Sequence, residues 1–355
     1  MSSSHLSTFP SSKRSRFEEI QDQPSYFAFV CDENDISVKQ LPESLKSRVV
    51  VGNKIEKFGD AANIISVIWK PPGKPSVVKE LFEKIKETQG NYPPWLHSFF
   101  AGVDGLSSFL SQIDPDITKT TNGRGAFSSS LAEFSLAAML YFNKQIPRLE
   151  SNFKDRKWDP FVMNTLKHST IGFLGWGSIA QTTADLLLPF QVNLICYRRR
   201  KNLLDENPRV KFVQSKFDIA KQSDFIVNTL PATKETLNFV DDEFLNSMKK
   251  TGIFINVGRG STVDEDALVM ALKEDKILGA YLDVYKKEPL EGNHPFFTCN
   301  QSKLLLSSHN ADNTFDYIPL GWKIFEENYS CFLNDFKPNS ETGFKPTFFD
   351  PKTGY

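Results

Sequence analysis

The sequence predicts an α/β fold of two doubly wound domains, each with a parallel sheet covered by helices on both faces. Short apolar runs at residues 26–31, 48–52 and 64–70 alternate with amphipathic stretches, and the alternation restarts after a break at residues 157–160. Strands that alternate with helices indicate βαβ units and therefore parallel sheets. A chain of 355 residues can also bury two separate hydrophobic cores.

In the first series a further strand is expected at residues 96–102, and residues 75–89 have the apolar spacing of a helix that begins with a proline. A long helix rich in Ala and Leu is expected over residues 128–153, where Pro147 should kink or end it. The second series predicts seven strands, in the stretches TIGFLGW, VNLICYR, KFVQ, DFIVNTLP, GIFINVGRG, ILGAYLDV and KLLLSSH.

An amphipathic helix from Thr314 to about Asp335 could return to the first domain, so we expect the second domain to be inserted into the first. The expected boundaries are a disordered tail at 1–25, a flavodoxin-like domain at 26–130 plus 315–340, a second domain at 131–314, and a C-terminal tail at 341–355.

Composition limits the partners. The formal net charge is −1, with 40% hydrophobic and 24% charged residues, which argues against general affinity for nucleic acid or for an anionic membrane. The four dispersed cysteines predict reduced thiols and no metal site. No apolar run reaches the roughly 18 residues of a membrane span. The Ser-rich start with KRSR could be a transit peptide or a nuclear-localisation-like patch, but we favour a disordered tail on a cytoplasmic protein.

A glycine turn opens the second series. Gly175, Gly177 and Ala180 form the pattern G-x-G-x-x-A between a predicted strand and a predicted helix. This is the setting of a dinucleotide-binding Rossmann turn, in which the pyrophosphate lies at the N-terminus of the helix. A purely structural glycine turn is the alternative, and the flanking strand and helix favour dinucleotide binding. The second domain would then bind the cofactor and the first the substrate.

A basic cluster follows the next predicted strand. An NAD site usually has an acidic residue ~20 residues beyond the glycines, to bind the ribose hydroxyls. Here the chain has Arg198, Arg199, Arg200 and Lys201. Guanidinium groups pair with a 2′-phosphate in charge-assisted hydrogen bonds, so we favour NADP(H), with NAD(H) as the second candidate. The alternative is a solvated loop, and the sequence does not assign one of the four cations to the phosphate.

Three later strands end in residues suited to catalysis. Arg259 lies between Gly258 and Gly260, Asp283 and Glu288 follow another strand, and His309 follows a third. Each residue alone could be an ordinary surface or structural residue. The carboxyl ends of parallel strands form one ligand-binding edge of the sheet. An arginine, a glutamate and a histidine that follow such strands together indicate a catalytic site, although none of them does so alone.

These stretches resemble the family of D-isomer-specific 2-hydroxyacid dehydrogenases, especially its glyoxylate/hydroxypyruvate reductase branch. The resemblance covers about residues 26–337 and rests on NVGRGSTVDEDAL, DVYKKEP and SHNA. It implies that Arg259 holds the substrate carboxylate, that His309 is the general acid, and that Glu288 keeps His309 protonated. It also implies that Asp283 orients the nicotinamide amide.

The same resemblance implies two sets of binding residues. Those expected around the cofactor, besides Asp283, are Gly175, Gly177, Ser178, Ile179, Arg198, Arg199, Lys201, Leu230, Pro231, Val257, Gly258 and Ala311. Those expected around the substrate, besides Arg259 and His309, are Trp69, Lys70, Gly102 and Val103. The sequence departs from the family pattern at Ser308, in place of a proline, at Tyr285, in place of a phenylalanine, and at Asp312, an unexpected acid.

The leading hypothesis is an NADPH-dependent reductase that converts small 2-oxo acids to D-2-hydroxy acids, and the resemblance implies a homodimer. A second hypothesis is a dinucleotide-sensing co-repressor on the same fold, which the KRSR stretch would suit and the basic cofactor corner opposes. A degenerate relative without activity is disfavoured, because all three catalytic residue types are present.

Overall fold

The described residues of the computed structural model are 26–198 and 207–352. The expected disordered tail at 1–25 lies outside them, as do Arg199, Arg200 and Lys201. The described chain divides into two compact units: unit 1 holds the residues up to Gly123 and from Gly321 onward, and unit 2 is Arg124–Leu320. These divisions fall near the boundaries expected at 130/131 and 314/315, and unit 2 interrupts unit 1 in the sequence.

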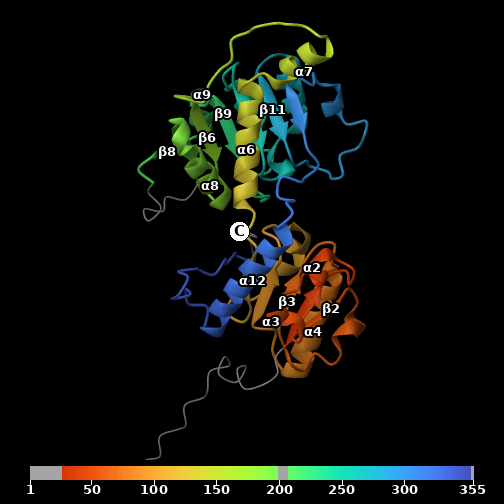
Figure 1. Ribbon diagram of the computed structural model, residues 1–355. Helices are drawn as coiled ribbons and strands as arrows, with labels where there is room; N and C mark the ends of the chain where they lie inside the picture. The colour runs from red at the N-terminus through yellow and green to blue at the C-terminus, as the bar shows by residue number, and fades with distance from the viewer. Residues whose placement is uncertain (1–25, 199–206, 353–355) are drawn as a thin grey trace, which may run out of the picture. The chain divides into compact units, whose positions relative to one another are not determined.

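Unit 1 is built on a parallel sheet, whose five described strands lie in the order β2-β1-β3-β4-β5. Figure 1 labels β2 and β3 of this sheet. The strands are β1 Tyr26–Val30, β2 Val49–Gly52, β3 Ile64–Trp69, β4 Trp95–Ser98 and β5 Lys119–Asn122. The helices and 3-10 turns are α2 Ile36–Lys39, α3 Glu43–Lys46, η1 Ile55–Phe58, α4 Pro75–Gln89, η2 Asp104–Leu106, α5 Ser107–Leu110 and α12 Tyr317–Leu333.

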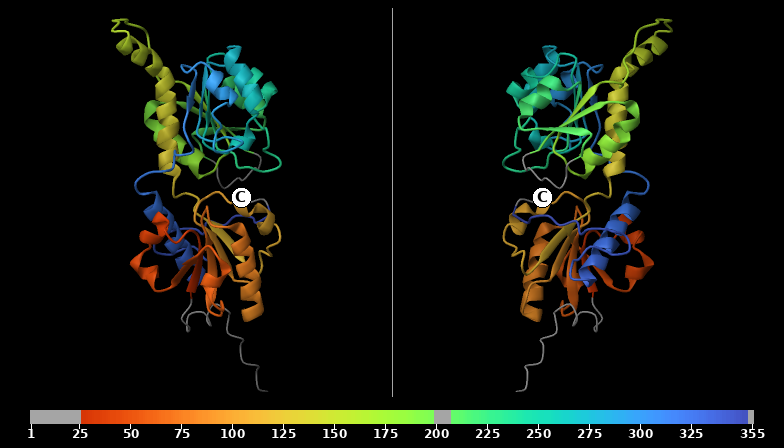
Figure 2. Two further views of the ribbon diagram at one scale, coloured as in Figure 1. Left: turned by 90° about the vertical axis from the view of Figure 1, so that its right-hand side faces the viewer. Right: turned by 90° about the vertical axis from the view of Figure 1, so that its left-hand side faces the viewer.

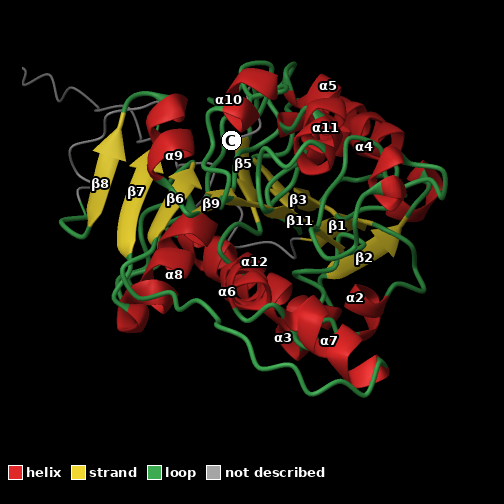
Figure 3. Ribbon diagram, turned by 90° about the horizontal axis from the view of Figure 1, so that it is seen from above, coloured by secondary structure: helices red, strands yellow, loops and turns green. Residues whose placement is uncertain are grey.

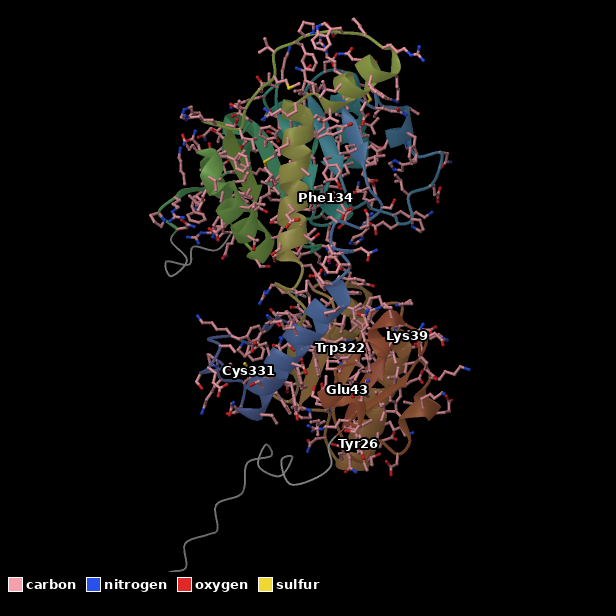
Figure 4. All side chains as sticks on the ribbon, viewed as in Figure 1. Tyr26, Lys39, Glu43, Phe134, Trp322 and Cys331 are labelled. Carbon is pink, nitrogen blue, oxygen red and sulfur yellow. The ribbon has the colours of Figure 1, made fainter. Side chains whose placement is uncertain are left out.

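Helix α12 returns the chain to unit 1, as its amphipathic spacing predicts. Its aromatic residues recur at helical intervals and cover one face of the sheet. The Phe325 ring stacks on Trp95 at 5.1 Å, and the Trp322 ring meets Phe29 edge-on at 5.2 Å. The indole N–H of Trp322 donates to the carbonyl of Ser37 at 3.0 Å. Figure 4 labels Trp322 and Cys331 on this helix and Tyr26 at the start of β1.

The C-terminal segment differs from the tail expected there. Thr347 is bound on both sides, because its N–H donates to Asn328 Oδ1 at 3.0 Å and its carbonyl accepts from Asn122 N at 3.2 Å. Phe349 is buried in the core of unit 1. The segment is too short and aperiodic to show a pattern in the sequence, yet its backbone pairs with β5.

Unit 2 contains a larger parallel sheet, whose seven described strands lie in the order β12-β11-β10-β9-β6-β7-β8. The strands are β6 Thr170–Leu174, β7 Asn193–Tyr197, β8 Val210–Val213, β9 Phe225–Asn228, β10 Ile253–Asn256, β11 Gly279–Leu282 and β12 Leu304–Leu306. Six of them lie within their predicted stretches, and β8 begins at Val210, one residue before the stretch KFVQ. The chain order reverses at β6, where β7 and β9 pair with it on opposite sides, and such a switch point is where these sheets bind ligands.

Helices cover both faces of this sheet. Helices α6 and α8 share one apolar core with the sheet, and α9, α10 and α11 share the other. Figure 3 shows α8 and α9 on opposite sides of β6, β7 and β8. The helices and 3-10 turns are α6 Ser128–Asn143, α7 Ile146–Lys154, α8 Ser178–Leu187, η3 Leu188–Phe190, α9 Lys216–Gln222, α10 Asp242–Asn246, η5 Gly260–Thr262, α11 Glu265–Lys273 and η6 Pro295–Thr298.

Pro147 ends the predicted long helix, one of the two outcomes expected of it. The chain turns at Gln145, whose φ of 49° is left-handed, and Pro147 lies in the first turn of α7, where a proline removes no helical hydrogen bond. Figure 2 shows α7 and the loop after it projecting from the rest of unit 2. None of the residues of α7 is buried.

Two further expectations concern the described residues. No helix among them is both long and apolar enough to cross a membrane. The four cysteines, all within the described ranges, are buried free thiols. Burial raises the pKa of Cys31 to about 12 and that of Cys196 well above its ordinary value.

Candidate active site

The glycine turn lies directly after β6. Gly175 has φ +92°, and a Cβ there would lie 3.2 Å from Thr229 Oγ1, so the position requires glycine. Gly177 precedes α8 without a side-chain cap, and a Cβ there would meet nothing within 4 Å. Open space in front of Gly177 and uncapped N–H groups in the first turn, at Ser178 and Ile179, fit a dinucleotide pyrophosphate. Ala180 is fully buried, so the helix packs closely on the sheet.

Buried asparagines connect the next two strand ends. Asn228, the last residue of β9, donates from Nδ2 to Asn256 Oδ1 at 3.0 Å and to Thr262 Oγ1 at 2.7 Å. Asn256 Oδ1 also accepts from Gly258 N at 3.1 Å. The network fixes Leu230, Pro231, Val257 and Gly258 at the carboxyl edge of the sheet. Sequence reasoning did not single out either asparagine, although both end predicted apolar strands.

The two glycines beside Arg259 are required by close packing. A Cβ on Gly258 would lie 2.7 Å from the carbonyl oxygen of Leu230, and one on Gly260 would lie 1.9 Å from the carbonyl carbon of Tyr285. The backbone that carries Arg259 therefore lies directly against the loops after β9 and β11. The guanidinium of Arg259 donates from Nη1 to the carbonyl of Gly258 at 2.9 Å.

Asp283, directly after β11, holds the loop that carries His309. The residue is 1% exposed. Oδ1 accepts from Ser307 Oγ at 2.7 Å and from Asn310 N at 3.1 Å, while Oδ2 accepts from Ala311 N at 3.3 Å. His309 N donates to the carbonyl of Asp283 at 2.8 Å. These bonds keep His309 in a left-handed conformation, with φ 51°, of a kind that concentrates at functional sites.

His309 and Glu288 form an ion pair, with Nδ1 and Oε2 2.7 Å apart. The hydrogen bond to Glu288 raises the pKa of His309 above its ordinary value, although burial and the charge of Arg259 oppose this. Burial would raise the pKa of Glu288, but hydrogen bonds from His309 and from Tyr285 N outweigh it and lower that pKa. Both shifts favour the charged forms, an imidazolium beside a carboxylate.

Asp312, the unexpected acid, belongs to the same cluster of charges. Burial raises the pKa of its carboxyl, and the charge of Asp283 adds to this effect, while those of His309 and Arg259 oppose it.

Among the described residues no group of three or more His, Cys, Asp and Glu side chains is arranged to hold a metal ion.

Arg198, the one described residue of the basic cluster, directly follows β7. Its guanidinium lies over the ring of Phe212 on β8, 3.9 Å from the ring centroid. Arg199 and Lys201, the other two residues named for the cofactor in this cluster, lie outside the described residues.

The four substrate residues expected in the first domain all lie in unit 1. Trp69 is 3% and Lys70 4% exposed. Trp69 Nε1 donates to the carbonyl of Gly73 at 2.8 Å, and Lys70 Nζ pairs with Asp35 Oδ2 at 2.7 Å. Gly102 and Val103 lie between β4 and η2, and the carbonyl of Gly102 accepts from Ser98 Oγ at 3.3 Å. The polar ends of Trp69 and Lys70 thus have partners within the unit, and their pocket role stays a prediction.

Comparison with known proteins identifies the family. The model described as "D-isomer specific 2-hydroxyacid dehydrogenase, NAD binding domain" matches residues 136–311. The glyoxylate reductase of Thermofilum pendens is 34% identical over 57% of this chain and 62% of its own length, so the match spans less than two thirds of that relative. The human glyoxylate reductase/hydroxypyruvate reductase is 32% identical over 66% of this chain and 74% of its own length.

Solved structures show the same fold. A D-isomer specific 2-hydroxyacid dehydrogenase family protein from Aeromonas salmonicida superposes with a TM-score of 0.69 at 24% identity, over 93% of this chain and 100% of its own. The NADPH-dependent glyoxylate/hydroxypyruvate reductase SmGhrB of Sinorhizobium meliloti, solved with NADP and malonate, has a TM-score of 0.70 at 22% identity, over 93% and 98%.

The matching model is that of an NAD-binding domain, and it covers most of the unit that carries the glycine turn and the seven described strands. The chain belongs to the D-isomer specific 2-hydroxyacid dehydrogenase family and is similar within it to the glyoxylate and hydroxypyruvate reductases.

Proposed function

We propose that the protein is an NADPH-dependent reductase of small 2-oxo acids, of the glyoxylate and hydroxypyruvate type, which forms D-2-hydroxy acids. The observation that carries the proposal is the His309–Glu288 pair, 2.7 Å between Nδ1 and Oε2, with the charge of Arg259 acting on both residues. An imidazolium beside a guanidinium suits a substrate that has a carboxylate next to a carbonyl group.

Each of the three side chains has a separate task. Arg259 pairs with the substrate carboxylate and polarises the adjacent carbonyl, because its planar, permanently charged group binds carboxylates through two donors. The carboxylate of Glu288 accepts the hydrogen bond from Nδ1 of His309. Nε2 is therefore the nitrogen that donates its proton to the carbonyl oxygen of the substrate. The carboxylate also stabilises the charged imidazole until the proton is transferred.

A reduced nicotinamide, when bound, would supply the hydride that the carbonyl carbon receives. His309 adds the proton to the oxygen, so the keto group becomes a hydroxyl and the imidazole becomes neutral. The side chain of His309 is 43% exposed, so solvent can return the proton before the next turnover.

Binding of the dinucleotide is assigned to the expected cofactor residues of unit 2. Gly175, Gly177 and the N-terminus of α8 would hold the pyrophosphate. Three of the roughly four lone-pair sites of the Asp283 carboxylate are engaged by the His309 loop, which leaves one on Oδ2 for the nicotinamide amide. Arg198 supports a preference for NADPH, because a cation there would attract a 2′-phosphate.

Initial rates with NADPH and NADH, each with glyoxylate, hydroxypyruvate and pyruvate, test this proposal. We expect turnover with NADPH, its loss in Arg259→Ala and a severe reduction in His309→Ala. Full turnover by the arginine variant would overturn the mechanism, and a preference for NADH would overturn the cofactor assignment. Dinucleotide binding without turnover of any 2-oxo acid would instead favour the co-repressor type of sensor.

A further inference from the structure

Three side chains form a continuous stack beside the glycine turn. The guanidinium of Arg198 lies over the ring of Phe212, 3.9 Å from its centroid. The ring of Phe212 in turn meets Trp176 edge-on, with centroids 5.5 Å apart. Trp176 is the residue between Gly175 and Gly177, and it also meets Phe173 of β6 at 5.7 Å. We call Arg198, Phe212 and Trp176 the arginine stack.

Strand register explains why these residues meet. Phe212 on β8 pairs with Cys196 on β7, so both side chains point to the same face of the sheet. Arg198 lies two residues beyond Cys196 and continues on that face, which α8 also covers. Phe212 packs at the edge of this apolar core and is half-buried. One side of its ring is therefore supported by the core, and the other supports the guanidinium.

Arg198, at one end of the stack, lies where dinucleotide-binding proteins distinguish NAD from NADP. Arg198 is the first residue after β7 and lies about 20 residues beyond Gly177, where NAD-binding proteins have the acid that binds the ribose hydroxyls. At the other end of the stack, Trp176 belongs to the turn that would hold the pyrophosphate. The stack therefore links the expected positions of the pyrophosphate and of the adenosine ribose.

The geometry of stacking suits phosphate binding. A guanidinium carries its N–H donors along its edge, and stacking occupies only its flat face. A ring under that face restricts the rotamers of a long side chain before a ligand arrives, so less conformational freedom is lost on binding. The attraction between the cation and the ring also holds the charge at one place.

We propose that Phe212 is a positioning residue, which holds Arg198 in place to bind the 2′-phosphate of the adenosine ribose. This inference rests on the proposed NADPH preference and assigns the phosphate contact to Arg198 among the four cations of the basic cluster. The alternative is a purely structural role, in which Arg198 covers the edge of the core at Phe212 and binds no ligand.

The test is calorimetric titration of the full chain with 2′,5′-ADP and with 5′-AMP, which differ only in the 2′-phosphate. The wild type should bind 2′,5′-ADP more tightly. Phe212→Leu should weaken 2′,5′-ADP by about two- to fivefold, the size of a partly exposed cation–π contact, and leave 5′-AMP unchanged. Phe212→Tyr keeps the ring face and should restore the wild-type ratio. Arg198→Ser should weaken 2′,5′-ADP by about tenfold or more.

Controls separate positioning from simple packing. Phe297→Leu removes a ring that is 55% exposed elsewhere in unit 2 and should change neither affinity. Arg198→Lys leaves Phe212 in place but removes the planar group, and should reduce the ratio even if Phe212→Leu folds poorly.

The possible failures are distinguishable. An unchanged ratio of the two affinities in Phe212→Leu, with loss of the ratio in Arg198→Ser, would overturn the positioning role and leave the NADPH proposal intact. Equal binding of both ligands by the wild type would overturn the NADPH preference and this inference with it.

Discussion

Protonation of a buried histidine should make unit 1 sensitive to acid. His97 on β4 is 0% exposed, and its ring centroid lies 5.2 Å from that of Phe325 and 5.8 Å from that of Trp95. Its Nδ1 lies 2.8 Å from Thr121 Oγ1, and its Nε2 has no hydrogen-bond partner among the described residues. Burial lowers the pKa of His97 to about 3, so the folded protein holds this ring neutral.

The pH dependence follows from that lowered pKa. The unfolded chain binds a proton at this histidine below its ordinary pKa of 6.5, whereas the folded chain does so only near 3. The free energy of unfolding is therefore unaffected by His97 above pH 6.5, and falls by about 1.4 kcal/mol per pH unit between these two values. Between pH 7.0 and pH 5.0 this one group should remove about 2 kcal/mol.

His97→Asn tests this prediction, because asparagine can keep the hydrogen bond to Thr121 but does not titrate. Urea unfolding followed by tryptophan fluorescence would report on unit 1, where Trp69, Trp95 and Trp322 are buried. The wild type should lose about 2 kcal/mol more than the variant between pH 7.0 and pH 5.0. As a control, His168→Asn replaces an exposed histidine at φ 65°, which asparagine tolerates. Equal losses in the wild type and His97→Asn would refute the reasoning.

Three further predictions concern the site and the assembly. Glu288→Gln removes the carboxylate that raises the pKa of His309, so the active protonated form should be lost at lower pH; a profile of kcat/KM from pH 5.5 to 9 should show its alkaline fall shifted toward acid, and an unshifted profile contradicts the role of Glu288. Asp312→Asn removes a carboxylate that would repel the substrate carboxylate, so KM for glyoxylate should fall roughly two- to fivefold at neutral pH. An unchanged KM would show that the charge of Asp312 does not act on the substrate. Phe153, Trp158 and Val162 are 85%, 94% and 89% exposed on α7 and the loop after it; if they form the interface of the expected homodimer, Trp158→Asp should convert a dimer to a monomer in light scattering, whereas an unchanged mass excludes this surface.

Much of the fold could be predicted from the sequence, because buried parallel strands are continuous apolar runs. Each of the seven described strands of unit 2 overlaps a predicted stretch, and the reversal of chain order at β6 places the glycine turn at the switch point. Strand β5, with the sequence KTTN, was not predicted, because polar residues at 119–122 carry no apolar signal. Helix α9 was not predicted either, because its seven residues are too few to show a clear helical period.

For the candidate site, the sequence predicted that three strand ends come together, but it did not predict most contacts between their residues. Because Arg259, Glu288 and His309 each follow a predicted strand, the sequence predicted that they lie at one edge of the sheet. In the structure Glu288 and His309 are at hydrogen-bond distance. The sequence did not reveal that Asp283 binds the backbone at Asn310 and Ala311, because those residues meet only when two distant strands pair. The partners of Trp69 and Lys70 inside unit 1 depend on tertiary packing in the same way.

The contact at Gly260 has a consequence for redesign of the substrate range. With a Cβ position only 1.9 Å from the carbonyl carbon of Tyr285, the loop bearing Arg259 cannot shift without moving the loop that leads to Glu288. In the proposed mechanism, the position of Arg259 and that of Glu288 are therefore coupled, so both loops should be transferred together in a redesign. Libraries that vary substrate preference should leave residues 258–260 and 283–288 fixed and diversify Asp312 and its neighbours.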